Sequence, residues 1–395
     1  MAALLSPDGI PAPVFATRAV QALLSERRGR PVNADRAWQG LSNLKLLSVC
    51  GLDDDRRTVR VHQLVQRAVR EAWPGRREQT AVCAADALLE AWPDVERDLM
   101  LVDLLRTNTE ALCRNSGDAL WHGGLHQVVF RAGNSLTLRG LPSAALAYWK
   151  ALLPAAVDRL GPHHPDTLTI RNNLAWARSR TGSSDRALTD MRELLTVRRR
   201  VLGADHPNTL ATEHGIADFQ AETGDVDGAI EILRRLVAGY ERVLGPDERD
   251  TLNTRLSLVR LLASSQAPAE AVAHLRELLA DYVHVLGPGW PETLDVEFSL
   301  AGALVAADEF SEARSTTERL VGEYTRVLGP DHVDTLRARF CAADLHGRDG
   351  RRKQAAGEMR ELLDDVQRLL QLGRREAEEI REWIRQWSGD EDQPE

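Results

Sequence analysis

The stretch VLGADHPNTL occupies residues 201–210, and close copies of it begin at residues 243, 285 and 327. These copies read VLGPDERDTL, VLGPGWPETL and VLGPDHVDTL, so successive copies start 42 residues apart. A looser copy, RLGPHHPDTL, lies one period earlier, at 159–168. A constant period of this size is typical of stacked supersecondary units, none of which can bury its apolar face alone.

Each copy has the composition of a turn between two helices. An apolar helical pattern ends at Leu202 and its equivalents, and the Gly that follows can adopt the left-handed conformation that closes a helix. Pro follows this Gly in most copies and cannot continue the helix. A second Pro, such as Pro207, suits the first turn of a new helix, because its missing N–H has no helical partner there.

A second break lies between the copies, for example TGSSD at 181–185 and TGDVD at 223–227, so each unit reads as helix, turn, helix. A small residue follows this break in the same register in every unit. These residues are Ala187, Ala229, Ala271, Ala313 and Ala355. A recurring small residue permits close approach of two helices, and the apolar spacing of the second helix predicts that one of its faces is core.

This pattern resembles the tetratricopeptide repeats (TPR), in which a Leu and a small residue in helix A and an Ala early in helix B are characteristic. Leu174, Ala175 and Ala187 match them. The usual unit has about 34 residues, so the longer unit here corresponds to about one extra turn in each helix. The long form and its LGPDHPDTL-like connections look most like the repeats of kinesin light chains and their bacterial relatives.

The resemblance extends one period upstream, because Gly133, Gly140 and Ala145 precede Ala175, Gly182 and Ala187 by one repeat. We therefore predict an all-α fold, a right-handed TPR-like α-solenoid preceded by a winged-helix-like domain with a small β-hairpin. The predicted parts are the winged-helix-like domain at 1–75, a helical linker at 76–117, six helix pairs at 118–370, and a capping helix with an acidic tail at 371–395.

The N-terminal residues do not follow the repeat. FATRAVQALLSER and ADRAWQGLSNLKLLSVC read as two helices, the second running into a strand after Leu46, and TVRVHQLVQRAVREAW reads as a strand leading into a helix. The segment RVHQLVQRAVR resembles the end of the winged helix in STAND-type regulators, the NB-ARC ATPases. Of that family's Met-His-Asp motif this chain has only His62, which the resemblance implies as a nucleotide-sensing residue. The alternative, an ordinary His at a helix start, stays open.

A phosphate-binding loop of the form G-x-x-x-x-G-K-[ST] does not occur in the sequence, so we expect that this chain alone binds no nucleotide. The resemblance then implies either the C-terminal part of a larger ATPase switch or a derivative that lost the ATPase module. An upstream nucleotide-binding module is accordingly a candidate partner.

Composition indicates a cytoplasmic protein without cofactor or metal. No signal peptide is evident, no apolar run approaches the roughly 20 residues of a membrane helix, and the four cysteines are scattered. Histidines in the inter-unit turns do not suggest a catalytic or metal site, because the equivalent residues are Glu248 and Trp290; these histidines are His163, His164, His206 and His332. We therefore expect no enzymatic activity.

Helix A of each unit is expected to line a concave groove that binds a protein or peptide ligand. The family's groove-facing positions, carried over residue by residue, are Asn172, Trp176, Arg180, His214, Asp218, Glu222, Asn253, Arg260, Asp295, Phe298, Phe340 and Asp344. The alternative for several of them, above all Phe298 and Phe340, is packing against a neighbouring helix. We predict a non-enzymatic scaffold that serves as the sensor or partner-recognition arm of a STAND-type regulator.

The rival function is that of a DNA-binding transcriptional regulator that uses the winged helix while the repeats sense a ligand. Residues 1–80 carry 13 Lys and Arg against 8 Asp and Glu, whereas the whole chain has a net charge of −9. Because this acidity would repel DNA, we do not expect nucleic acid as a partner. The lack of a long apolar run likewise leaves no membrane among the expected partners.

One charge pattern follows the period. Three residues before the register position of each unit, which is Leu174 in the first of them, the sign of the charge alternates along the chain through Arg171, Glu213, Arg255, Glu297 and Arg339. We predict that equivalent residues of neighbouring units face each other and form a ladder of ion pairs.

Overall fold

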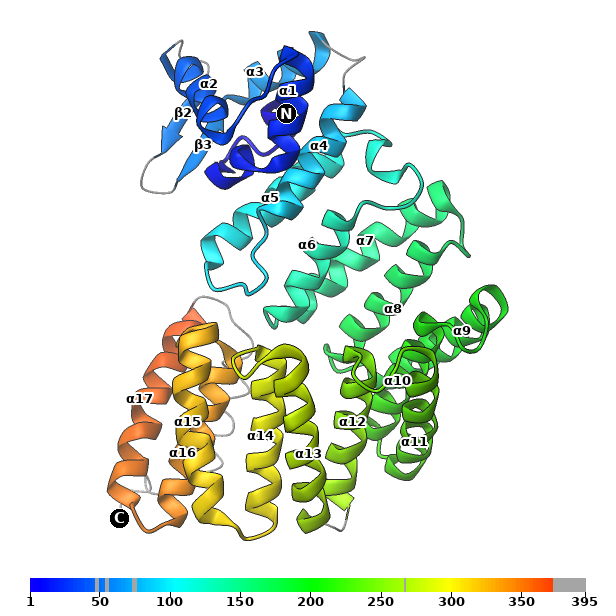
Figure 1. Ribbon diagram of the computed structural model, residues 1–395, viewed down its shortest axis with the longest axis vertical. Helices are drawn as coiled ribbons and strands as arrows, with labels where there is room; N and C mark the ends of the chain where they lie inside the picture. Colours follow the sequence, from blue (N-terminus) through cyan, green and yellow to red (C-terminus); the bar gives the residue numbers. More distant parts are fainter. Residues whose placement is uncertain (47–49, 54–56, 73–76, 266–267, 372–395) are drawn as a thin grey trace, which may run out of the picture. The chain divides into compact units, whose positions relative to one another are not determined.

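The computed structural model of this protein describes residues 1–46, 50–53, 57–72, 77–265 and 268–371. Helices dominate these residues, and strands occur only near the N-terminus (Figure 1). The contacts divide the chain into two compact units. One comprises residues 1–139 and 147–170, and the other comprises residues 140–146 together with the described part of 171–395.

The first unit begins with a small sheet framed by helices. The elements run in the order η1 (Ala2–Leu4), β1 (Ile10–Pro11), η2 (Ala12–Ala16), α1 (Arg18–Arg28), α2 (Ala34–Leu46), β2 (Cys50–Asp53), β3 (Thr58–Val61) and α3 (Gln63–Ala72). The predicted hairpin is present as β2 and β3, with Cys50 opposite Val61. A third strand that we did not predict, β1, pairs with β3 on its other side, so the antiparallel order is β1-β3-β2.

Helices α4 (Arg77–Glu90) and α5 (Leu99–Asn115) pack against these N-terminal elements. The Glu90 carboxylate accepts hydrogen bonds from the backbone N–H groups of Arg18 and Ala19, at 2.9 and 3.2 Å, and so satisfies free donors at the start of α1. The fully buried Asn108 of α5 accepts a hydrogen bond from the Ser6 N–H and donates one to the Gly9 carbonyl. These bonds attach the segment predicted as a linker to the N-terminal elements.

Helix α6 (Gln127–Leu138) and the later part of α7 (Pro142–Leu160) also belong to the first unit, which ends at residue 170. The buried Trp149 of α7 lies against Gly133 of α6, where the Cβ of any larger residue would stand only 2.2 Å from the indole ring. Tyr148 donates a hydrogen bond to the Val129 carbonyl at 2.8 Å. The small residue that the repeat pattern placed at 133 is therefore required by close packing.

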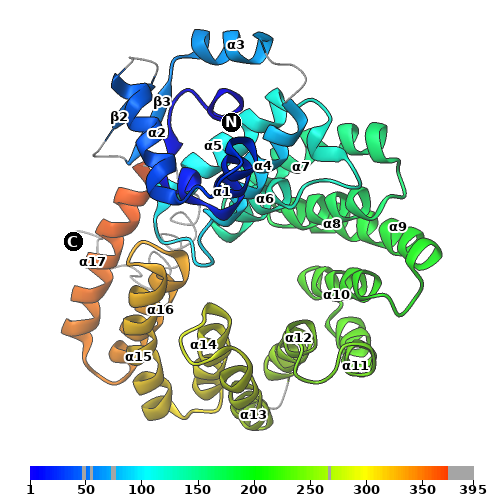
Figure 2. The same ribbon diagram turned by 45° about the horizontal axis from the view of Figure 1, so that its top comes forward.

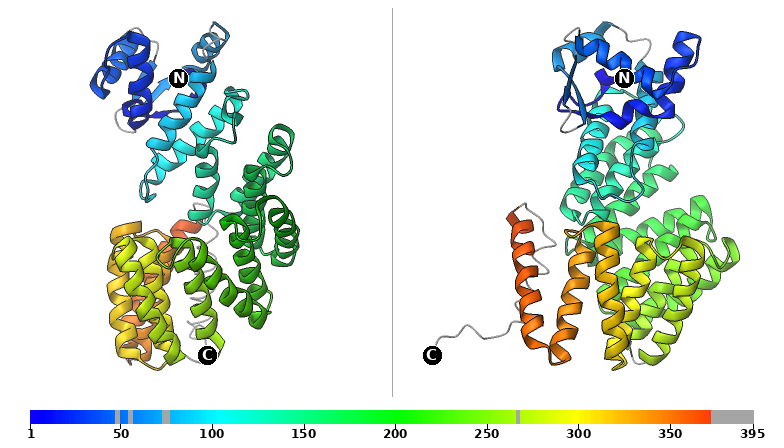
Figure 3. Two further views of the ribbon diagram at one scale, coloured as in Figure 1. Left: turned by 45° about the vertical axis from the view of Figure 1, so that its right-hand side comes forward. Right: turned by 60° about the vertical axis from the view of Figure 1, so that its left-hand side comes forward.

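The second unit is built from consecutive helices, each packed against the helix before it and the helix after it (Figures 1 and 3). The boundary between the units falls within α8 (Pro165–Ser179), at residue 170. The repeat helices that follow are α9 (Ser184–Leu202), α10 (Pro207–Glu222), α11 (Val226–Val243), α12 (Arg249–Ser265), α13 (Pro268–Leu286), α14 (Pro291–Ala306), α15 (Phe310–Leu328), α16 (Val333–Arg348) and α17 (Arg352–Gln371). The predicted all-α, TPR-like solenoid is confirmed. Figure 2 shows the A helices α10, α12, α14 and α16 on the inner side of the arc that these helices follow, with the B helices outside.

The repeated turn is held by its Gly and its Thr. Gly203 and Gly329 have φ of 94° and 92° with ψ of 161° and 163°, so φ is positive as expected, but ψ is extended rather than helical. A Thr at the start of the next A helix donates to the carbonyl of this Gly in four turns, through Thr209, Thr251, Thr293 and Thr335 at 2.7 to 2.8 Å. The repeated sequence therefore closes one helix and anchors the next.

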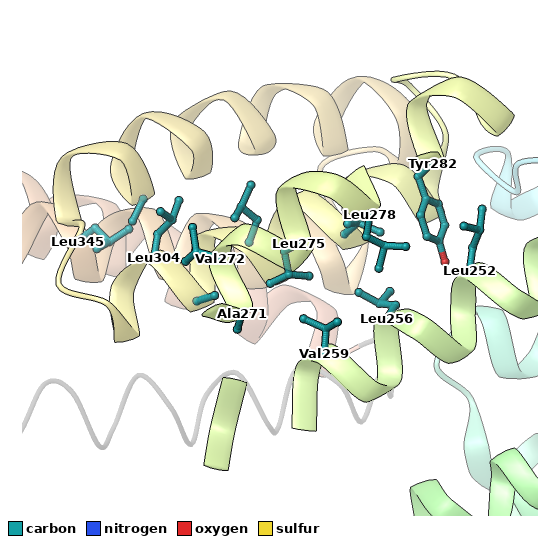
Figure 4. Packing of buried hydrophobic residues seen from close by; sticks show 14 residues of the cluster. Leu252, Leu256, Val259, Ala271, Val272, Leu275, Leu278, Tyr282, Leu304 and Leu345 are labelled. Carbon is teal, nitrogen blue, oxygen red and sulfur yellow. The ribbon is translucent and has the colours of Figure 1, made fainter. Parts of the chain in front are cut away.

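The repeated Ala of helix B is buried in every unit, as predicted: Ala187, Ala229, Ala271, Ala313 and Ala355 are 0 to 2 % exposed. Apolar side chains from α12, α13 and α14 form one continuous cluster around Ala271, and Leu275, Leu278 and Tyr282 project into it from α13 (Figure 4). Because neighbouring repeats share this cluster, each repeat depends on the next for burial.

The predicted ladder of ion pairs is wrong. Each of the five alternating residues pairs with helix B of its own repeat, and in the described part of the chain none pairs with its equivalent in the next repeat. The pairs are Arg171 with Glu193, Glu213 with Arg235, Arg255 with Asp281, Glu297 with Arg319, and Arg339 with Asp365. The alternating residues of helix A face the antiparallel helix B rather than the next helix A. The sign of each charge on helix A is therefore matched by a residue of opposite charge on helix B.

The predicted capping helix and acidic tail at 371–395 lie almost wholly outside the described residues. The domain boundaries given above stay predictions. Within the described ranges, no helix is both long enough and apolar enough to cross a membrane.

Candidate functional site

The twelve predicted groove residues lie on the A helices or directly after them. Asn172 and Trp176 belong to α8, and Arg180 follows its last residue; the others belong to α10, α12, α14 and α16. All twelve are at least partly exposed. We call this set of twelve residues the wall.

Hydrogen bonds and ion pairs join wall residues of successive A helices. His214 of α10 contacts Ser257 of α12 through Nε2 at 2.9 Å. Arg260 of α12 donates to the Asp295 carboxylate of α14 at 2.7 Å and to Ser299 at 2.8 Å. These contacts run from helix A to helix A, and they fix polar side chains that would otherwise be free to rotate.

Aromatic wall residues are also held by their neighbours. Trp176 meets the buried Phe219 of α10 edge to face, with ring centroids 4.8 Å apart. Phe298 lies under the guanidinium of Arg337, 5.7 Å from its ring centre. Phe340 packs against the apolar cluster of the last repeat, around Leu336 and Met359. Each ring therefore combines exposure with packing.

Acidic wall residues occupy different environments. Glu222 accepts hydrogen bonds from the hydroxyl groups of Ser179 and Ser184, at 2.5 and 2.8 Å. Burial raises the pKa of Asp218 above its ordinary value, against the opposing charge of His214, whose Nε2 lies 3.6 Å away. Asp344 accepts from Arg348, one turn further along α16, at 2.8 Å.

Two wall asparagines are oriented from behind by helix B. Asn172 accepts a hydrogen bond from Arg198 of α9 at 3.3 Å, and Asn253 accepts one from the Tyr282 hydroxyl of α13 at 2.6 Å. Residues 198 and 282 occupy the same repeat position, two periods apart.

Sequence reasoning missed five residues that hold the wall: Arg198, Ser257, Tyr282, Ser299 and Arg337. Ser257 and Ser299 are one period apart, so a search of each repeat position for polar residues could have found them. Arg198 and Tyr282 were missed because they belong to helix B, where only apolar spacing was considered.

His62, predicted as a weak nucleotide-sensing residue, precedes α3 and is exposed. Its Nδ1 accepts a hydrogen bond from the Leu64 N–H at 3.2 Å, which is a helix-capping contact. The turn histidines do the same: His164, His206 and His332 each accept from the N–H two residues later. Among the described residues, no group of three or more His, Cys, Asp or Glu could hold a metal ion.

Comparison with family models identifies tetratricopeptide repeats at residues 167–208 and 210–282. The chain therefore contains TPR units, the building blocks of scaffolds for protein–protein interaction. Comparison with curated proteins finds no match.

Several solved structures are similar to this chain at low sequence identity. A putative kinesin light chain of Podosopora anserina with nearly identical TPR-like repeats is 22% identical, covers 51% of this chain and 94% of its own, and has a TM-score of 0.40. A Rap protein complexed with Competence and Sporulation Factor is 12% identical, covers 85% and 94%, and has a TM-score of 0.50. A STAND protein with a TPR sensor from Pyrococcus horikoshii is 10% identical, covers 99% and 59%, and has a TM-score of 0.42.

Proposed function

We propose that this protein is a non-enzymatic scaffold that binds a protein or peptide segment along the wall. The observation that carries the proposal is the chain of contacts from α8 to α16, which holds exposed polar and aromatic side chains in place on successive A helices. Side chains fixed before binding lose little conformational entropy when a ligand arrives.

The wall suits a segment with both apolar and charged side chains. Trp176 and Phe298 offer aromatic surface, and Arg180, Asp218 and Glu222 offer both signs of charge within two neighbouring repeats. Aromatic residues and Arg dominate the binding energy of protein interfaces. The ligand is accordingly an extended or helical protein segment rather than a small molecule.

The finer proposal is that the wall is the partner-recognition arm of a STAND-type regulator. It rests on the segment RVHQLVQRAVR at 60–70 and on the order β1-β3-β2 of the N-terminal sheet, which is the order of a winged helix. The helix-capping contact of His62 supports a structural role for that residue in this chain.

DNA binding through the same N-terminal elements is the second candidate. Helix α2 precedes the β2–β3 hairpin, as a recognition helix does, and it exposes Arg36, Gln39 and Asn43 on its surface. These are side-chain types that read base edges. The overall charge of −9 opposes this function.

Selection of peptides from a random library displayed on phage tests the scaffold function. We expect peptides that bind the protein and lose at least about tenfold in affinity to the variants Asn172→Ala and Arg180→Ala, because hot-spot truncations cost this much or more. Fluorescence anisotropy of the selected peptides measures the loss.

The matched variants are Arg192→Ala on α9 and Arg234→Ala on α11, exposed arginines outside the wall. They should bind like the unmodified protein. If the wall variants and the matched variants lost peptide affinity equally, the binding site would lie outside the wall. If the library yielded no binding peptide and the protein instead shifted duplex DNA in a gel at low salt, the DNA-binding function would be favoured.

A further inference from the structure

Two neighbouring repeats, α8–α9 and α10–α11, depart from the repeated pattern at three positions that meet in space. Arg198 stands where the following repeats have Tyr240, Tyr282 and Tyr324. Asn208 stands where the A helices α8, α12, α14 and α16 each have an acidic residue near their start, at Asp166, Asp250, Glu292 and Asp334. Asn172 stands where the later repeats have His214, Leu256, Phe298 and Phe340. Departures from a repeated local pattern are expected at functional positions.

Arg198 is a buried cation without an acidic partner. Its side chain lies in the interior, with 3 % of the residue exposed. Its three hydrogen bonds all come from Nη1, to the Asn172 side chain, the Asn208 carbonyl and the Thr212 hydroxyl at 3.3, 2.7 and 2.6 Å. Nε is buried with no partner among the described residues. No carboxylate accepts a hydrogen bond from this guanidinium in the described part of the chain.

Burial is costly for this group. It lowers the pKa of Arg198 to about 10, with only Tyr240 acting in the opposite direction. A buried charge is normally paired or replaced by a neutral residue. Three other repeats place a neutral, fully buried Tyr at this position, so the fold itself does not need the cation.

The missing acid lies next to this cation. Arg198 donates to the backbone of residue 208, the position that is Asp or Glu in the other repeats and Asn here. A carboxylate at 208 would bring negative charge beside the guanidinium. The repeat that contains the buried Arg is thus followed directly by the one A helix, among α8, α10, α12, α14 and α16, that lacks an acid at this position.

Arg198 also determines which way the Asn172 amide faces. A guanidinium only donates hydrogen bonds, so the atom of Asn172 that meets it is the carbonyl Oδ1. The amide Nδ2 has no hydrogen bond to another described residue, and Asn172 is partly exposed on α8. The wall therefore presents an N–H donor at this point, with an uncompensated positive charge behind it.

We propose that Asn172 forms a subsite that selects a carboxylate group of the bound peptide segment. Arg198 lies behind Asn172, orients its amide and supplies the positive charge of this subsite. The ligand carboxylate accepts from Asn172 Nδ2 at the surface and is attracted by the buried guanidinium. Arg198 acts here as a positioning residue and as the source of charge. This inference rests on the proposed peptide-binding function and names the chemistry of one part of the ligand.

Three pools of fluorescein-labelled nine-residue peptides test it. All contain Leu, Ala, Gly and Trp; the first adds Asp and Glu, the second Asn and Gln, and the third Lys and Arg. We expect the unmodified protein to bind the acidic pool about tenfold more tightly than the neutral one. Arg198→Tyr and Asn208→Asp should each reduce this preference to about twofold or less, because one removes the charge and the other neutralises it.

Both variants restore residues that other repeats carry, so we expect them to fold and to melt at or above the temperature of the unmodified protein. Asn172→Leu should lose the preference as well, and the control Arg192→Gln, an exposed arginine on the same helix as Arg198, should keep it. A preference for acidic peptides that survives Arg198→Tyr, or an equal affinity for acidic and neutral pools, would overturn the subsite alone. Absence of binding to all three pools would instead overturn the peptide-binding function.

Discussion

Gly133 shows how strongly one side chain can be restricted by its neighbour. A Cβ at this position would lie 2.2 Å from Cζ2 and 2.4 Å from Cη2 of the buried Trp149. Trp149 cannot move away easily, because Phe130 and Tyr148 pack against its ring. We expect Gly133→Ala to destabilise the protein by about 1–3 kcal/mol, the usual cost of an overpacked core, as measured by thermal unfolding.

The matched control is Gly322→Ala, in the exposed part of α15, where the added methyl group meets no atom within 4 Å. Ala restricts the unfolded chain and favours the helix, so this variant should gain about 0.5–1 kcal/mol. If Gly133→Ala behaved like Gly322→Ala, the close packing of α6 on α7 would be refuted.

Helix α16 is connected to both neighbouring B helices by one histidine. The buried His346 contacts Glu318 of α15 through Nε2 at 2.8 Å and Glu358 of α17 through Nδ1 at 2.7 Å. Burial lowers its pKa, but the hydrogen bonds to the two carboxylates outweigh burial, and the pKa lies above the ordinary value of 6.5. Arg314, Arg351 and Gln354 are the other polar groups near this cluster.

A folded-state pKa above the unfolded value means that the protonated form stabilises the fold. This contribution is complete below about pH 6.5, the unfolded pKa, and is lost as pH rises through the raised folded value. We therefore expect His346→Gln to cost about 1–3 kcal/mol at pH 6 and much less at pH 9, as measured by urea unfolding at both pH values. The exposed His274 of α13 is the control, and His274→Gln should show no such difference. An equal cost of His346→Gln at both pH values would contradict the charged contact.

Charge alternates along the array, and each of the alternating residues pairs with helix B of its own repeat; Glu213 also pairs with Arg199 of the preceding B helix, at 2.7 Å. Arg255 and Asp281 pair at 2.8 Å within one repeat, and Glu213 and Arg235 pair at 2.7 Å in the repeat before with the signs exchanged. We expect Arg255→Glu to lower stability by up to about 1 kcal/mol, because it sets two acids opposite each other. Adding Asp281→Arg should restore stability, since it recreates the arrangement of the preceding repeat, and high salt should shrink both effects.

The companion variant separates internal pairing from pairing between repeats. Glu297 occupies the equivalent helix A position in the next repeat and pairs with Arg319. Glu297→Arg should therefore not rescue Arg255→Glu and should add its own loss. If Glu297→Arg restored the stability of Arg255→Glu and Asp281→Arg did not, the result would support ion pairing between repeats instead. Thermal unfolding at low and high salt measures all of these variants.

The repeats could be predicted because every unit repeats the same local chemistry. Gly at the end of helix B, Pro at the start of helix A and Ala187 with its equivalents are residues whose backbone or size preferences act within a few residues. Where the pattern was strict, the helices α8 to α17 followed it, and the twelve wall residues did lie on or beside the A helices with exposed surface. Whether these twelve bind a ligand is still a prediction.

Contacts between separate helices could not be predicted from the sequence in the same way. The sequence placed Arg171, Glu213 and Arg255 on one face of helix A, but it did not reveal that this face meets helix B of the same repeat. It also gave no reason to connect Arg198 with Asn172 and Asn208, which are 26 and 10 residues away along the chain. Local preferences act through the backbone and specify each helix, whereas the partner of a charged side chain depends on how the helices cross, and only the tertiary structure decided that.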